Sequence, residues 1–115
     1  MAFIEVHIGN KSDLKLYEGD DIIGFTITVT NSDDTDFDFS GYTDINLRIY
    51  TNSSRGTVEA TIPASNLSIS GNVITWTTDY SLTIGLSTGL YYYDLEYEDA
   101  SSRPQTIAYG NMRII

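Results

Sequence analysis

The sequence has no cysteine, one histidine and only six lysine and arginine residues in a chain of 115. Without cysteine it has no disulfide framework, no cysteine-ligated zinc and no thiol nucleophile. Sixteen acidic residues give a net charge of −10, which argues against binding to nucleic-acid phosphates, since that needs clustered basic side chains. No apolar run approaches the roughly 18 residues of a membrane-spanning helix, and no signal peptide is visible at the N-terminus.

The residue types that are abundant favour a β-sheet protein. The chain contains 14 isoleucines, 14 threonines and nine tyrosines, and such β-branched and aromatic side chains fit a pleated, half-buried surface. Hydrophobic residues make up 41% of the sequence, which is close to a globular average and argues against wholesale disorder. The length suits one ordinary domain, so residues 1–115 are predicted to form a single domain.

Short runs of alternating apolar residues are separated by turn signals along the whole chain. The clearest run spans residues 23–29, where four apolar side chains alternate with glycine and threonine. Other apolar runs lie at residues 3–8, 45–49, 58–62, 67–69, 74–76, 82–86, 91–97 and 106–115. Gly71–Asn72 is predicted to form a tight turn. This spacing is typical of an all-β sandwich or barrel, and it predicts about seven to nine strands.

One local feature favours an immunoglobulin-like antiparallel β-sandwich over a closed barrel. The segment Leu86–Tyr91 resembles a tyrosine corner, in which a tyrosine near the start of a late strand bonds back to upstream backbone. A plain hairpin loop ahead of an aromatic strand is the alternative, and both interpretations stay open. Tyr93 stands where an antibody domain has its second cysteine, and Trp76 comes too late for the usual core tryptophan. A true antibody-type domain is therefore not predicted.

The sequence does not contain a recognisable catalytic set. His7 would have to serve any Ser-His-Asp triad, but it is expected to be a half-exposed strand residue, and no Gly-x-Ser-x-Gly elbow is present. Glu96 and Glu98 are neighbours on a strand face that should meet water, whereas glycosidases place two carboxylates across a sugar-sized cleft. Glycine-rich phosphate loops are also absent. We predict no catalytic residue, no cofactor and no enzymatic activity.

Two acidic turns are rich in the carboxylate oxygens that calcium binds. Asp34, Asp36 and Asp38 have the one-three-five spacing of an EF-hand loop, which also needs glycine at its sixth position and glutamate at its twelfth. Those two positions hold Phe39 and Ile45, so the motif fails. A solvated turn is expected, with calcium as the alternative, and the turn at residues 18–21 has the same two interpretations. No metal site is predicted.

The tyrosines are the strongest candidates for contact with a partner. Tyrosine is enriched at interfaces because it combines apolar area with a polar tip. Tyr91 and Tyr93 are predicted to fill the core and its rim. The candidate interface residues are Tyr42, Tyr50 and Tyr92.

Several segments together carry a family resemblance. They are Tyr17–Asp21, Phe25–Val29, Asp38–Gly41, Ile45–Ile49, Leu86–Leu95 and Ile107–Met112. Their pattern is a Gly-Asp turn before one strand, an apolar-x-Gly segment before the next, and a Gly-x-Tyr at the start of a late strand. In this respect residues 14–115 resemble the N-terminal domain family of phage baseplate upper proteins and related small virion modules.

The resemblance implies a non-catalytic β-sandwich that docks onto other virion structural proteins. It implies a location in the virion and several copies or a homo-oligomer, with no nucleic-acid or membrane partner. Baseplate upper proteins continue into further domains, whereas this sequence stops at Ile115. This difference favours a standalone virion component over the baseplate role. The expected function is that of a virion structural protein, namely a capsid decoration protein, a head-fibre or tail adaptor, or a baseplate-type module. A carbohydrate- or cell-surface-binding adhesion module is the alternative, based on the tyrosine and tryptophan content and the acidic turns.

Overall fold

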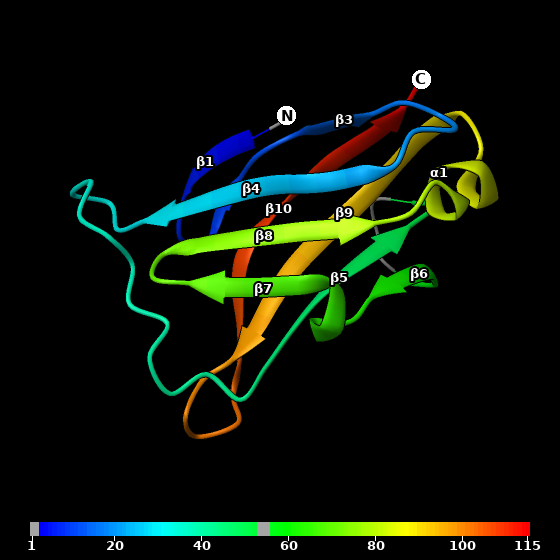
Figure 1. The fold of residues 1–115 in the computed structure, drawn as a ribbon. Coiled ribbons are helices and arrows are strands. Elements are labelled where there is room, and N and C mark those ends of the chain that lie inside the picture. The colour runs from blue at the N-terminus through cyan, green and yellow to red at the C-terminus, as the bar shows by residue number, and fades with distance from the viewer. Residues whose placement is uncertain (1–2, 53–55) are drawn as a thin grey trace.

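The computed structural model describes residues 3–52 and 56–115, and most of this chain is β-structure (Figure 1). The described strands are β1 (Phe3–His7), β2 (Asn10–Lys11), β3 (Leu14–Leu16), β4 (Ile22–Thr30), β5 (Asp44–Tyr50), β6 (Val58–Ile62), β7 (Leu67–Ser70), β8 (Val73–Thr78), β9 (Gly89–Glu98) and β10 (Pro104–Ile114). A 3-10 turn at Ala64–Asn66 precedes β7, and the short helix α1 (Ser81–Leu86) connects β8 to β9. The predicted all-β fold is confirmed, and the described residues form ten strands, one above the predicted range of about seven to nine.

Two sheets pack against each other around a shared core. The smaller sheet has the order β1-β4-β8-β7, and the larger has the order β2-β10-β9-β5-β6, with β3 also paired to β10. Most neighbouring strands are antiparallel, but β1 runs parallel to β4, and β2 and β3 run parallel to β10. The sandwich is therefore mixed, which corrects the expected wholly antiparallel pairing. The immunoglobulin-like topology stays a prediction.

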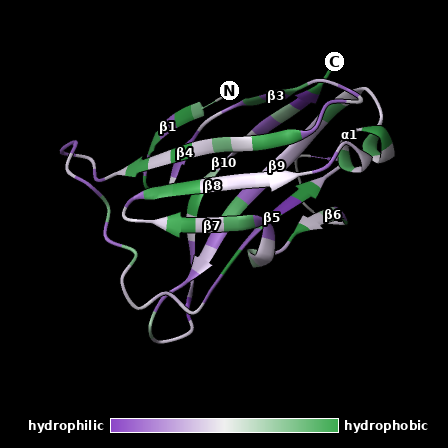
Figure 2. Cartoon of the chain, viewed as in Figure 1, coloured by the Kyte–Doolittle hydropathy of each residue, from purple (hydrophilic) through white to green (hydrophobic). Residues whose placement is uncertain are grey.

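The core is built from alternate residues of strands in both sheets. In β4, Phe25 and Val29 are buried while the threonines between the apolar residues are half-exposed, as the period-two pattern predicts. The pattern is wrong at Ile23, which is 70% exposed because the pairing of β4 with β8 is irregular between Ile22 and Phe25. Trp76 of β8 is fully buried and meets Phe25 edge-on, with 5.9 Å between the ring centroids. Leu47 of β5 and Leu95 of β9 face them from the larger sheet. Figure 2 shows the same mixture of hydrophobic and hydrophilic residues along the strands.

The N-terminal segment crosses from one sheet to the other, which produces the parallel pairings. After β1 the backbone reverses, so that β2 and β3 lie along β10. At this crossing a Cβ atom added to Gly110 would lie 2.6 Å from the carbonyl oxygen of Ser12. The Tyr93 hydroxyl donates a hydrogen bond to the same oxygen, and the Asn111 amide donates one of 3.0 Å to the Asp13 carboxylate. Burial raises the pKa of Tyr93, so the phenol remains a protonated donor.

The segment between α1 and β9 forms the predicted tyrosine corner. The Tyr91 hydroxyl donates a hydrogen bond to the backbone carbonyl of Leu86 and lies 3.3 Å from the carbonyl oxygen of Ser87. Ser87 has a φ of +61°, which is uncommon for a residue other than glycine. The corner interpretation is confirmed, and the hydroxyl fixes the bend through which the chain enters β9.

The apolar run at residues 82–86 forms helix α1 instead of a strand. The Asp79 carboxylate accepts a 3.0 Å hydrogen bond from the Ser81 amide at the start of the helix. Hydrogen bonding to Ser81 holds the pKa of Asp79 below its usual value. Thr83 and Leu86 are buried, whereas Ile84 is exposed. The local turn at Asp79 thus prevails over the alternating pattern, because a side-chain acceptor satisfies a helix-terminal amide.

Replacing Gly110 with alanine should lower the free energy of unfolding by about 1–3 kcal/mol, the usual cost of forcing an extra carbon into a packed site. The Ser12 carbonyl would have to move, which would also weaken its hydrogen bond from Tyr93. Urea denaturation followed by circular dichroism measures the change.

Gly85→Ala is the matched control for Gly110→Ala. Apart from the adjacent residues and the backbone of its own helix, nothing lies within 4 Å of the Cβ position at Gly85, so alanine there should be neutral or slightly stabilising. Wild-type stability of the Gly110 variant would contradict the close approach of Ser12 to β10.

Candidate interaction surfaces

Two of the three candidate interface tyrosines lie opposite each other on the outer face of the larger sheet. Tyr50 of β5 pairs directly with Tyr92 of β9 in the antiparallel register. Tyr92 is half-buried, whereas Tyr50 is only 4% exposed. The Tyr50 hydroxyl donates a 3.0 Å hydrogen bond to the Asp94 carboxylate. Tyr92 therefore has the larger surface available to a partner, and Tyr50 positions Asp94.

A half-buried cluster of charges lies beside these tyrosines. Arg48 Nε is 3.1 Å from Asp94 Oδ1, and the same guanidinium forms an ion pair with Glu96. The exposed fractions of the Arg48, Asp94 and Glu96 side chains are 35%, 13% and 22%. The acidic face of β9 points outward as predicted, but it is only half-exposed. Arg48 offsets the repulsion between two neighbouring carboxylates that are partly withdrawn from water.

Apolar and aromatic side chains border the charge cluster. β10 places Tyr109 beside Asp94 and Asn111 beside Tyr92. Tyr109, Leu90 and Val58 are exposed. The tyrosine face is defined as the outer surface formed by Tyr50, Tyr92, Tyr109, Arg48, Asp94 and Glu96. Tyrosine and arginine on a partly dehydrated surface are typical of protein–protein interfaces.

The third candidate, Tyr42, lies on a different part of the molecule. It belongs to the loop between β4 and β5 and is 42% exposed, and its amide donates a 3.1 Å hydrogen bond to the Phe39 carbonyl. Phe39 packs edge-on against Tyr97 of β9, with 5.3 Å between ring centroids. A shallow pocket of about 570 Å³ beside Tyr42 is lined by residues 36–42, 69, 71 and 72. The three predicted tyrosines therefore belong to two surfaces.

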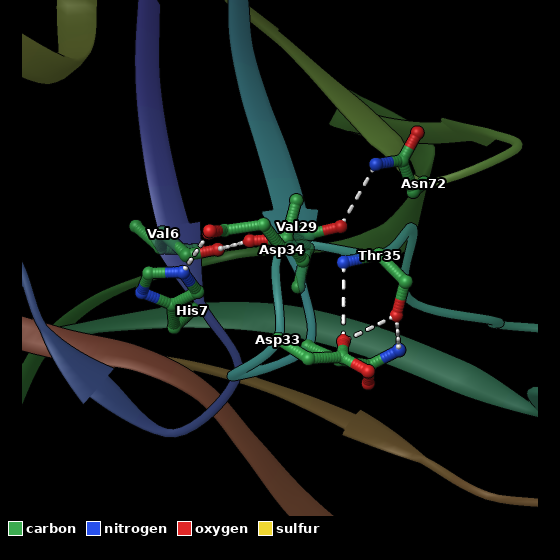
Figure 3. A network of polar contacts seen from close by, with 9 residues as sticks. Val6, His7, Val29, Asp33, Asp34, Thr35 and Asn72 are labelled. Atoms are coloured by element: carbon green, nitrogen blue, oxygen red, sulfur yellow. Dashed lines mark hydrogen bonds and ion pairs between the residues drawn. The ribbon is translucent and has the colours of Figure 1, made fainter.

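The acidic part of the same loop is held by hydrogen bonds of its own carboxylates (Figure 3). Asp34 lies 2.7 Å from Nε2 of His7, which connects the loop to β1. The Asp33 carboxylate accepts hydrogen bonds of 2.5 and 3.2 Å from the hydroxyl and amide of Thr35. These bonds hold the pKa of Asp33 below its usual value. His7 is half-exposed, as predicted.

The carboxylates of this loop act as acceptors for the turn. Asp38 accepts a 2.8 Å hydrogen bond from the Ser40 amide, and this bond lowers the Asp38 pKa. In the part of the chain that the structure describes, no group of three or more histidine, aspartate or glutamate side chains is arranged to hold a metal ion. The hydrogen bonds of a solvated turn account for these contacts.

A third surface, which sequence reasoning missed, lies where β3 turns into β4. Tyr17 and Ile23 line a pocket of about 340 Å³ there, and Ile84 is exposed on the adjacent helix α1. The signal in the sequence is the pair Ile22–Ile23, because neighbouring residues in a strand point to opposite faces. Ile22 is buried, and Ile23 is 70% exposed.

No protein-family model matches the sequence, and a search of curated proteins finds no significant match. Within residues 3–52 and 56–115, neither helical segment has the length and apolar character needed to cross a membrane.

Replacing Arg48 with methionine should lower the free energy of unfolding by about 2 kcal/mol, between the values typical of exposed and buried ion pairs. Methionine keeps most of the aliphatic stem but leaves Asp94 and Glu96 without their cation. Adding Glu96→Gln should restore part of the loss, because it removes one of the two carboxylates. Urea denaturation at neutral pH measures both changes.

Arg113→Met is the control, since Arg113 is an exposed arginine on β10. It should change stability by less than about 0.5 kcal/mol. Equal effects of the two arginine substitutions would show that Arg48 does not stabilise the carboxylates of β9.

Proposed function

We propose that this chain is a structural module of a bacteriophage particle that works through protein–protein contacts. Its partners are other structural proteins of the particle, and several copies are incorporated. The observation that supports this proposal most is the tyrosine face, because its composition is that of a protein interface. The resemblance of residues 14–115 to small virion modules supports the phage context.

The tyrosine face is suited to binding because its central side chains are already held in place. Asp94 and Glu96 fix the Arg48 guanidinium, and the Tyr50 hydroxyl bonds to Asp94. A partner would therefore lose less side-chain entropy when it docks on a surface ordered in advance. Tyr92 and Tyr109 offer apolar area with a polar tip around this centre. These properties favour a static contact with another protein.

Phage particles purified from cells that carry the gene should contain the protein, as measured by quantitative mass spectrometry. The double variant Tyr92→Ser and Tyr109→Ser should be incorporated at least about tenfold less, because it removes two aromatic contacts from the interface. Both substitutions lie at the surface, and circular dichroism checks that the variant folds.

Tyr42→Ser serves as the control because Tyr42 lies on the other surface, and it should be incorporated like the wild type. Purified particles that contain none of the wild-type protein would exclude the proposal. Normal incorporation of the double variant would show that the tyrosine face is not the surface that contacts the particle.

Binding of a carbohydrate or another cell-surface ligand is a second candidate function, favoured by the pocket beside Tyr42. This pocket combines an exposed aromatic ring with the carboxylates of Asp36 and Asp38 and the amide of Asn72. Small-molecule sites combine apolar surface with a few polar groups in this way. Trp76 contributes nothing to such a site, because it is fully buried in the core.

A glycan array probed with and without calcium tests the second candidate. Saturable binding of a sugar that is lost in Tyr42→Ser, but kept in the double variant of the tyrosine face, would favour adhesion. If no glycan binds in either condition, the adhesion candidate is wrong. A signal that requires calcium would also assign a metal to the acidic loop, where the solvated turn predicts none.

A further inference from the structure

The pocket between β3 and β4 is a second apolar surface, separate from the tyrosine face. Its floor is formed by Leu16 and Phe25, which are 6% and 5% exposed, and by the fully buried Thr83. Its walls are Tyr17 and Ile23, which are 53% and 70% exposed. The volume of about 340 Å³ is at the lower end of the range of roughly 300–1,000 Å³ for ligand clefts. It suits a large side chain better than an extended ligand.

The local backbone turns Ile23 toward solvent. The pairing of β4 with β8 is irregular between Ile22 and Phe25, and Gly24 within this bulge has a φ of +65°. Such bulges are known to redirect side chains at sheet edges. The described part of β1 pairs with Thr26 to Thr30 of β4. This pairing therefore does not include Ile23. The exposure of Ile23 follows from this backbone geometry.

Helix α1 extends the apolar surface and is fixed to the turn beside the pocket. The Thr83 hydroxyl accepts a 3.0 Å hydrogen bond from the Gly19 amide and lies 3.3 Å from the Asp20 carbonyl oxygen. The Tyr80 amide donates a 2.7 Å hydrogen bond to Asp21. Tyr80 and Ile84 are four residues apart, and their exposed fractions are 54% and 53%. The helix and the β3–β4 turn therefore form one preorganised rim.

Acidic side chains dominate the charge around this pocket. Glu18, Asp20 and Asp21 form the exposed β3–β4 turn, and Asp79 is exposed just before α1. The lining residues also include the cation Lys15. The four acidic side chains around the pocket outnumber it. The whole chain carries a net charge of −10, and a second copy would bring the same charges to this surface. Repulsion between like charges argues against self-association here and favours a basic partner.

We propose that this pocket binds an apolar side chain from a partner protein segment in which lysine or arginine residues flank that side chain. The apolar group fills the space between Tyr17 and Ile23, and the flanking cations face the Glu18–Asp21 turn. Tyr80 and Ile84 cover the remaining apolar part of the segment. This surface and its partner are independent of the tyrosine face, so the inference stands whether or not the protein belongs to a phage particle.

Titration of the ¹⁵N-labelled full chain with the synthetic peptide GKKLWKKG tests the proposal by NMR. Saturable shifts of the amide resonances of Ile23 and Thr83 are expected, with a Kd at or below about 1 mM. Raising the salt concentration from about 0.05 to about 0.5 M should weaken binding, because exposed charges are screened. The peptides GEELWEEG and GKKGGKKG should bind at least about tenfold more weakly, since one lacks the cations and the other the apolar group.

Two exposed apolar residues provide the variants: Ile23 lines the pocket, and Ile84 lies beside it on α1. Ile23→Ser and Ile84→Ser should each weaken binding of GKKLWKKG by about tenfold, and neither removes a buried side chain. Asp20→Asn should weaken it at low salt only. Phe3→Ser is the matched control, because Phe3 is an apolar residue of β1 that is 66% exposed. The affinity of this variant for GKKLWKKG should equal that of the wild type.

Several results would overturn the proposal. Among them are equal binding of the acidic peptide, unchanged affinity in both pocket variants, shifts confined to the tyrosine face, and no saturable binding of GKKLWKKG. Self-association of the unliganded protein that maps to Ile23 and Ile84 would also overturn it, because a second copy would then be the occupant.

Discussion

The close contact between Gly110 and the Ser12 carbonyl is the constraint on which the arrangement of the sheets depends. A side chain at position 110 would push the N-terminal segment off β10. With glycine there, β2 and β3 lie along β10 while β1 stays with the other sheet. The Tyr93 hydroxyl and the Asp13 carboxylate stabilise the same crossing. The chain then leaves β3 at the point where the acidic turn and the apolar pocket are formed.

The large acidic excess is accommodated by different means on different surfaces. In the turns, Asp33, Asp38 and Asp79 accept hydrogen bonds from nearby backbone and hydroxyl groups, which favours their charged form and lowers their pKa. On the tyrosine face, Arg48 balances the carboxylates of β9. At the β3–β4 turn the acids are exposed beside apolar side chains. This last combination gives the molecule a surface that is complementary to a basic, apolar segment.

The sequence is informative where a local pattern decides the structure. The alternation in β4 from Phe25 onward, the Gly71–Asn72 turn between β7 and β8, and the tyrosine corner at Tyr91 could all be predicted. The parallel pairing of β1, β2 and β3 could not, because the choice of a distant partner strand leaves no local periodicity. Among the candidate interface residues, Tyr50 and Tyr92 lie together because the register of β5 and β9 pairs them. Tyr42 lies apart from them, in the loop between β4 and β5. The exposure of Ile23 depends on the bulge next to Gly24.

Native-state hydrogen exchange of the Gly9 and Ser12 amides tests the central claim most directly, namely that the N-terminal crossing is an integral part of the sandwich. These amides donate hydrogen bonds of 2.8 Å each to the carbonyls of Ile107 and Tyr109 in β10. If the crossing holds the sheets together, both amides should exchange only through global unfolding, with the same free energy of opening as the amides of β9. Fast exchange of both amides while β9 remains protected would show that the segment opens on its own and would contradict the account.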